Sequence, residues 1–254
     1  MRKKVLWMLL LSTSLFAKGA TFLVHGTGYM YKFGGTLRRR SAVARVYILT
    51  EFYRWDNGYS IWGGGSELVW LGRDKGIIQL DPQQADYLIT GGLTKTYRSM
   101  VYYLFLDHPC YHTIDAPVDR SLYWNKIRIG MKNHDDFFKI PQNGFFYFVE
   151  LGFFLRHPDI WWLTTGHDFQ YDIKANIKRV IKRVGKMYVF MDITGYAGVS
   201  MHYSIHPMIE VLFGVGRRGT SGNEGQFVIG YRPLDRKTFR EAEGVLYAGI
   251  RTNF

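Results

Sequence analysis

One short stretch of the sequence crowds together side chains that could carry out chemistry. Residues 107–125 read Asp-His-Pro-Cys-Tyr-His-Thr-Ile-Asp-Ala-Pro-Val-Asp-Arg-Ser-Leu-Tyr-Trp-Asn. Nucleophilic catalysis needs a nucleophile, a base and a group that orients the base, all within hydrogen-bond reach. The side chains in this stretch that could fill these roles are His108, Cys110, His112, Asp115, Ser121 and Asn125.

Two other interpretations of 107–125 are open. On an extended strand His108, Cys110 and His112 project to the same side, and Asp115 could complete a four-ligand metal site. Pro109 hinders a regular strand, and an exposed thiolate site invites oxidation, so we expect neither metal nor cofactor. The remaining interpretation is a loop that is folded by hydrogen bonds of its Asp and His side chains.

The elements that must position these residues are strands, because apolar and polar residues alternate along most of the chain. The longest alternating segment is Met187 to Ser204. The last segment, 244–254, also alternates and ends on Phe254. Its two faces carry Leu246, Ala248, Ile250 and Thr252 on one side and Tyr247, Gly249, Arg251 and Asn253 on the other.

The alternation predicts an all-β, antiparallel transmembrane β-barrel with about 12 strands, and about 10 to 14 remain compatible with the chain length. A soluble periplasmic β-protein is the alternative fold. An even number of strands places both termini on the periplasmic side and 107–125 at the extracellular rim. The expected strands are 20–31, 43–54, 58–71, 86–97, 99–107, 121–132, 144–156, 160–171, 187–204, 207–217, 225–234 and 244–254.

The sequence features at the two ends of the chain predict the same cellular location. An alternating strand that ends in Phe254 resembles the terminal strand of bacterial outer-membrane β-barrels, which implies recognition by the barrel-insertion machinery. Residues 1–17 have a basic start, an apolar centre and a small-residue end, and they predict a signal peptide. We therefore expect residues 18–254 to form a single barrel domain, a monomeric, multi-pass protein of the outer membrane of a Gram-negative bacterium.

One basic segment departs from the alternation. In 172–186 the apolar residues recur at helical spacing, and this predicts a short basic amphipathic helix at the periplasmic rim. A long hairpin with a charged tip is the alternative. The helix would bind anionic lipid headgroups through Lys174, Lys178, Arg179, Lys182 and Arg183.

The net charge of the chain limits the classes of partner that it is expected to bind. The formal net charge of +12 favours anionic partners, which in an outer membrane are lipids, including lipopolysaccharide, or anionic solutes rather than nucleic acid. The polar strand faces carry both signs, so the lumen is either filled by salt-bridged side chains or an anion-biased pore. The residues expected to line it are Arg45, Lys126, Arg128, Lys132, Glu150, Asp192 and Glu210.

Two local motifs add a further resemblance. His108-x-Cys110-x-His112-x-x-Asp115 resembles the His-x-Ser-x-His-x-x-Asp motif of an uncharacterised family of outer-membrane barrels, with Cys at the Ser position. The stretch 120–125, which ends in Trp-Asn125, is similar to one in outer-membrane phospholipase, whose Asn orients the catalytic His. The residue two positions after His112 is Ile114 rather than Ser, so Cys110 fills the nucleophile position only if His108 is the base.

Three functions follow from these patterns. The first is a structural or porin-like barrel that passes small solutes. The second is a lipid esterase, of the phospholipase or lipid A deacylase type, with its active site in 107–125. The third is a barrel that binds anionic lipid through its basic segment.

Overall fold

The computed structural model describes residues 20–37, 40–72, 81–113, 122–141, 144–155, 169–200, 203–235 and 244–254. The predicted signal peptide lies outside them. The strands are β1 Ala20–Leu37, β2 Arg40–Arg54, β3 Tyr59–Gly72, β4 Asp81–Tyr97, β5 Met100–Thr113, β6 Leu122–Tyr123, β7 Asn125–Lys132, β8 Phe145–Leu155, β9 Phe169–Val184, β10 Met187–Ser200, β11 Ile205–Arg218, β12 Glu224–Asp235 and β13 Val245–Asn253.

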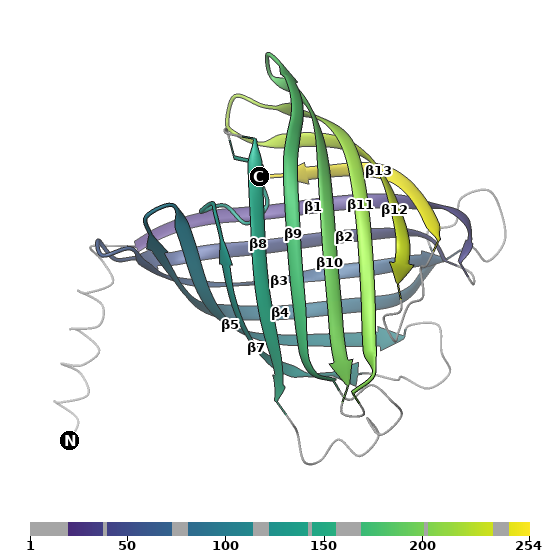
Figure 1. Cartoon of the computed structure of the whole chain (residues 1–254), viewed down its shortest axis with the longest axis horizontal. Helices are drawn as coiled ribbons and strands as arrows, with labels where there is room; N and C mark the ends of the chain where they lie inside the picture. Colours follow the sequence, from purple (N-terminus) through teal and green to yellow (C-terminus); the bar gives the residue numbers. More distant parts are fainter. Residues whose placement is uncertain are drawn as a thin grey trace.

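These strands form one closed antiparallel sheet (Figure 1). Each strand pairs with its neighbour in sequence, β1 pairs with β13, and the pairing of β4 with β5 completes the ring. The short β6 and the following β7 both pair with β5 and are separated by Trp124 alone, so they occupy one position in the wall. The result is a 12-strand barrel, as the alternation predicts.

The two ends of the barrel differ in their connections. At one end, which also holds Ala20 and Phe254, the turns include 55–58, 98–99 and 185–186, and we call this the short-turn end. The strand ends that border residues 73–80, 114–121, 156–168 and 236–243 lie at the opposite end, and we call it the long-loop end because these stretches of sequence are longer than the turns. The described parts of 107–125 therefore lie at the long-loop end, opposite Ala20 and Phe254.

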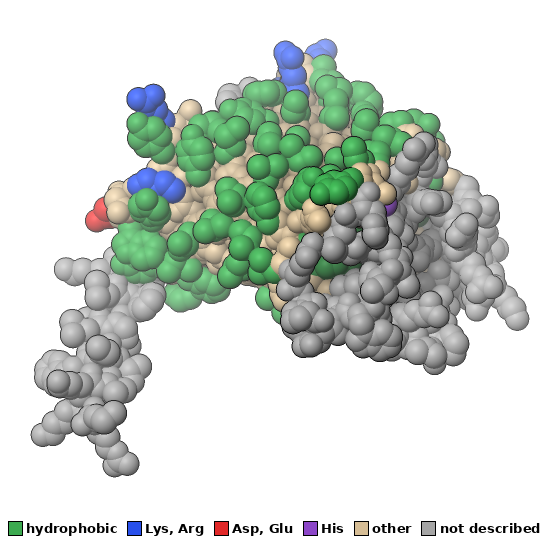
Figure 2. All heavy atoms as spheres, turned by 60° about the horizontal axis from the view of Figure 1, so that its bottom comes forward, with side chains coloured by type: hydrophobic (Ala, Val, Ile, Leu, Met, Phe, Trp, Pro, Cys, Tyr) green, Lys and Arg blue, Asp and Glu red, His purple; other side chains and the backbone are tan. Residues whose placement is uncertain are grey.

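The alternating residues divide between an apolar outer wall and a packed interior. Along β12 the side chains of Phe227, Ile229 and Tyr231 are about half exposed, whereas Gln226 and Val228 are buried. In Figure 2 hydrophobic side chains cover the outer wall, and Lys and Arg gather near its margins. Among the described residues no helix is long and apolar enough to span a membrane.

The predicted helix at 172–186 is wrong, because this segment is strand β9 followed by a tight turn. A bulge produces the apparent helical spacing. Val180 pairs with Phe190 but Lys182 pairs with Val189, which leaves Ile181 as an extra residue that reverses the alternation. The alternative, a long hairpin with a charged tip, is confirmed: Val184 pairs with Met187 across Gly185-Lys186.

Several strand limits also differ from the prediction. The strand expected at 160–171 falls mostly outside the described residues, and the eighth wall position is taken by β9 instead. The strand expected to end at 107 continues to Thr113. Pro109 has no N–H to donate, and it is tolerated because it faces the break between β6 and β7, where its carbonyl still accepts a hydrogen bond from the Trp124 N–H.

Candidate active site on the outer wall

The alternation of β5 decides where the candidate side chains lie. Tyr103, Phe105 and Asp107 are buried in the barrel, whereas Leu104 and Leu106 are exposed on the outside. His108, Cys110 and His112 follow the parity of Leu104 and Leu106. Three candidate residues are therefore on the outer wall, near the long-loop end, and not in the lumen.

Two short contacts link the candidates. The Cys110 Sγ atom lies 2.9 Å from Nε2 of His112, so the thiol and the imidazole can share a proton. The Nδ1 atom of His108 lies 2.9 Å from Oδ1 of Asn125, on the neighbouring strand β7. Because the amide oxygen accepts, His108 carries its proton on Nδ1, and its Nε2 is then an acceptor.

Aromatic side chains flank the thiol on both sides. Tyr87 of β4 pairs with Cys110 in register, and Tyr123 of β6 pairs with it from the other side. The Tyr87 ring meets the His112 ring edge-on, with centroids 5.5 Å apart, and the Tyr123 ring lies 5.6 Å from that of His108. Tyrosines are typical of the membrane–water interface in barrel walls.

The wall becomes apolar immediately beyond the histidines. Ile89 pairs with His108, and it is 67% exposed. Leu106, the next outward residue of β5, is 63% exposed, and Leu104 follows it. The thiol therefore lies at the boundary between an aromatic band and an aliphatic band.

The other two candidates, Asp115 and Ser121, fall in 114–121, outside the described residues. Among the residues that are described, no three His, Cys, Asp or Glu side chains converge as a set of metal ligands. His108 is directed to Asn125, whereas Cys110 and His112 contact each other. The geometry of the described candidates is that of two hydrogen-bonded pairs.

The residues expected to line the lumen all lie on inward faces of the strands, and most of these residues form ion pairs. The Arg128 guanidinium lies between two carboxylates, with Nε 2.7 Å from Asp107 Oδ2 and Nη1 3.1 Å from Glu150 Oε2. Further ion pairs are Lys126–Asp172, Lys178–Asp192, Arg251–Asp192 and Arg232–Glu210. Arg45 donates a hydrogen bond to the Ser66 hydroxyl. The Lys132 side chain is buried, with 1% of the residue exposed.

The basic residues of 172–186 do not form one surface. Lys174 and Lys178 point inward and contact Glu150 and Asp192, respectively. Arg179, Lys182 and Arg183 are exposed near the short-turn end. The five cations therefore divide between the lumen and the rim.

Aromatic rings fill the rest of the described interior. Tyr31, Phe33, Tyr188, Phe190 and Tyr247 are buried in one cluster. Several of these rings lie across glycines of the adjacent strand: a Cβ on Gly216 would fall 2.3 Å from the Tyr188 ring, and one on Gly230 would fall 2.3 Å from the Tyr247 ring. The interior is packed like a protein core.

A feature that sequence reasoning missed completes this packing. The connection between β7 and β8 turns into the barrel from the short-turn end, and we call residues 133–141 the inserted segment. Phe137 contacts the rings of Trp62, Tyr103 and Phe105, and Phe138 meets Tyr47. The available signal is the apolar pair Phe137-Phe138, which breaks the polar character expected of a turn.

Polar groups of the wall hold the inserted segment. The Asp136 carboxylate lies 2.9 Å from His25 Nδ1 and accepts hydrogen bonds from the backbone N–H groups of Phe138 and Lys139. Burial raises the pKa of this carboxyl, but these hydrogen bonds outweigh burial and hold the pKa well below its ordinary value. Arg218 donates to the Ile140 carbonyl at 2.6 Å.

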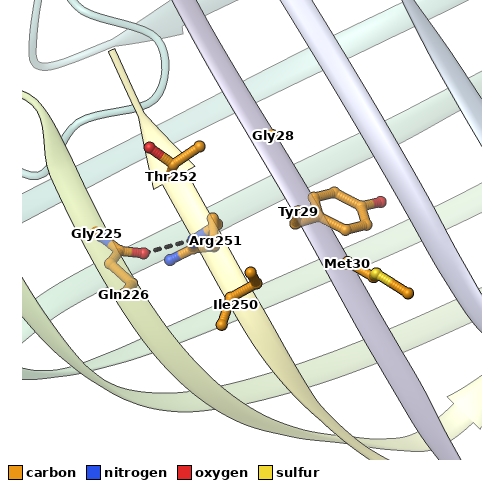
Figure 3. Close-up of a pocket in the computed structure, with 8 residues that line it drawn as sticks. All are labelled: Gly28, Tyr29, Met30, Gly225, Gln226, Ile250, Arg251 and Thr252. Atoms are coloured by element: carbon orange, nitrogen blue, oxygen red, sulfur yellow. Dashed lines mark hydrogen bonds between the residues drawn. The ribbon is translucent and has the colours of Figure 1, made fainter.

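A separate hollow of about 360 Å³ lies on the far side of the barrel, where β1, β13 and β12 meet (Figure 3). The exposed Met30 and Ile250 border it, and Gly28 and Gly225 leave it open. The strand order puts β1 to β4 between β13 and β5. This hollow is therefore not part of the candidate active site.

No protein-family model and no curated protein sequence matches the chain. Solved structures, in contrast, do match the chain. The chain has the fold of a bacterial outer-membrane β-barrel. Outer-membrane phospholipase A from Escherichia coli matches with a TM-score of 0.55 at 9% identity, over 95% of this chain and 97% of that chain.

Two further structures share the fold. The phospholipase of Salmonella typhi, solved as a dimer with bound calcium, gives a TM-score of 0.53 at 8% identity over 93% of this chain and 92% of that chain. The NanC porin gives 0.50 at 9% identity over 91% and 99%. Identities this low establish a common fold alone, because one fold hosts many activities.

Proposed function

We propose that this barrel is a thiol-dependent lipid acyl hydrolase of the outer membrane. One observation carries the proposal, the 2.9 Å contact between Cys110 Sγ and His112 Nε2 on the outer wall. A nucleophile paired with a base is the minimum arrangement for acyl transfer. Its place between tyrosines and aliphatic residues matches the depth at which a lipid ester meets water.

The chemistry begins at the thiol. The His112 imidazole takes the Cys110 proton, and the thiolate attacks the ester carbonyl of a lipid acyl chain. The tetrahedral intermediate collapses, and the imidazolium gives the proton to the departing lipid alcohol. A water molecule that is deprotonated by an imidazole then attacks the thioester, which releases a fatty acid and restores the thiol.

His108 is the second base of the site. With Nδ1 bound to Asn125, its Nε2 carries the lone pair that can accept a proton. His108 precedes Cys110 on β5, whereas His112 follows it. We assign to His108 the activation of water in the second step. This arrangement combines the two alternatives that the sequence leaves open, because each histidine has its own partner.

The alternative functions have weaker support. Porins and phospholipases share this fold, so the fold does not choose between them. The described interior is occupied by paired charges and aromatic rings, which argues against an open pore. The basic residues of 172–186 do not lie on one surface, and this weakens the prediction that they bind anionic lipid together.

Mass spectrometry of fatty acids released from phospholipid micelles tests the proposal. We expect Cys110→Ala and His112→Ala to lower the rate by about 10²- to 10⁴-fold, and Thr252→Ala, on the far outer wall, to leave it unchanged. Since Cys110 is the only cysteine, iodoacetamide should abolish release with a single adduct. Equal release by the folded Cys110→Ala protein would overturn the proposal.

A further inference from the structure

The wall beside the thiol carries a carboxylate. Glu67 of β3 is exposed, and it pairs with Val46 of β2 on one side and Tyr87 of β4 on the other. Val46 is 50% exposed and Tyr87 is 42% exposed, so this row faces outward. Because Tyr87 also pairs with Cys110, one row across the outer wall contains the carboxylate, a tyrosine and the thiol.

A carboxylate is an unusual side chain for the lipid-facing wall of a barrel. Acidic side chains on the outer face of a barrel are disfavoured, by an amount that depends on depth. Within the described part of the chain, the contact that the structure gives Glu67 is with the Tyr87 hydroxyl, and its paired outer-wall neighbours carry no basic side chain. Intramembrane acidic groups are by default candidates for a functional site.

The chemistry of the row points to a cation. A carboxylate beside an aromatic ring attracts an ammonium group through charge and through the face of the ring. Glu67 is two strand spacings from Cys110, about 10 Å, so a headgroup can reach the carboxylate while an ester of the same lipid lies at the thiol.

We propose that Glu67 and Tyr87 bind the ammonium headgroup of an amine-bearing phospholipid and so select the substrate of Cys110. This rests on the proposed hydrolase function. A lipid with only negative charge, such as a phosphatidylglycerol or the phosphorylated sugars of lipid A, is repelled by Glu67. Of the two lipid esterases that the sequence leaves open, the row therefore favours a phospholipase.

The test compares phosphatidylethanolamine and phosphatidylglycerol that carry the same acyl chains, in the same micelles. We expect the unmodified protein to release fatty acid about tenfold faster from phosphatidylethanolamine. Glu67→Gln should remove this preference, Glu67→Asp should retain most of it, and Glu67→Lys should reverse it. The conservative Asp variant controls for damage to the wall.

Failure of the inference and failure of the hydrolase function give different results. Equal hydrolysis of both lipids by the unmodified protein overturns headgroup selection and leaves the hydrolase standing. If neither lipid is cleaved, the hydrolase falls, and native mass spectrometry of lipids retained by Cys110→Ala tests binding alone. Retained phosphatidylethanolamine that is lost in the Glu67→Gln double variant supports the site, and equal retention of both lipids overturns it.

Discussion

The imidazole of His25 and the carboxylate of Asp136 meet inside the barrel, with Nδ1 2.9 Å from Oδ2, although 111 residues separate them in sequence. His25 belongs to the first strand, and Asp136 to the connection between β7 and β8. Both side chains are largely buried. This contact fixes the inserted segment against the wall.

Replacement of Asp136 should destabilise the barrel in a pH-dependent way. The folded-state pKa of Asp136 is depressed, so its contribution is present above the unfolded pKa of about 3.9 and is lost as the pH falls through the folded value. We expect Asp136→Asn to cost about 1–3 kcal/mol near pH 5 and progressively less towards pH 3.

Urea midpoints of detergent-folded protein, followed by heat-modifiable gel mobility, measure this difference. Lys139→Ala is the control. The Lys139 ammonium lies 3.7 Å from the same carboxylate, and the Lys139 side chain is more exposed than that of Asp136. A difference between the unmodified protein and Asp136→Asn that stays constant from pH 5 to pH 3 would contradict the assignment.

Replacement of Asp136-Phe137-Phe138 by Gly-Ser-Gly should loosen the packed interior. The segment contacts Tyr47, Trp62, Tyr103 and Phe105, and without it these rings lose their common partner. We expect the unmodified barrel to give no steady current in planar bilayers and the variant to give discrete steps. Steps of equal size from the unmodified protein would instead favour the pore.

Two glycines of β12 form a matched pair for testing the interior. A Cβ on Gly230 would fall 2.3 Å from the Tyr247 ring, whereas one on Gly225 would meet nothing within 4 Å. We expect Gly230→Ala to cost about 1–3 kcal/mol, because the buried ring must move, and Gly225→Ala to change the urea midpoint little. A Gly230→Ala loss as small as that of Gly225→Ala would show that the ring adapts freely.

Replacement of Asn125 should lower the rate of lipid hydrolysis more than it weakens lipid binding. Its side chain touches the His108 imidazole, so Asn125→Ala releases the ring from its tautomer and orientation. We expect kcat for lipid hydrolysis to fall by about 10- to 100-fold with little change in KM. Asn125→Asp, which keeps an acceptor at Oδ1, should restore much of the rate. An unchanged rate in Asn125→Ala would remove His108 from the reaction.

The barrel and its two faces are predictable because the pleat has a period of two. The predicted faces of the last strand are confirmed, with Ile250 66% exposed and Tyr247 1% exposed. Long alternating segments such as β10 need no tertiary information. The apparent helix at 172–186 was misleading because one bulge residue, Ile181, changes the parity in the middle of the strand.

The candidate site was only partly predictable. The sequence places His108, Cys110 and His112 on one side, but it does not say that this side faces outward. That depends on β5 continuing past Pro109 to Thr113 and on Asp107 joining the interior pair with Arg128. The inserted segment was not predictable, because its contacts come from strands distant in sequence.

The inserted segment also bears on the order of assembly. It touches β1 through His25, β9 through Lys178 and β11 through Arg218, and these strands lie on both sides of the β1–β13 seam. A segment that joins both halves of an unclosed sheet brings the two edges of the seam towards each other. We therefore expect the middle of the chain to act as an internal template on which the first and last strands meet.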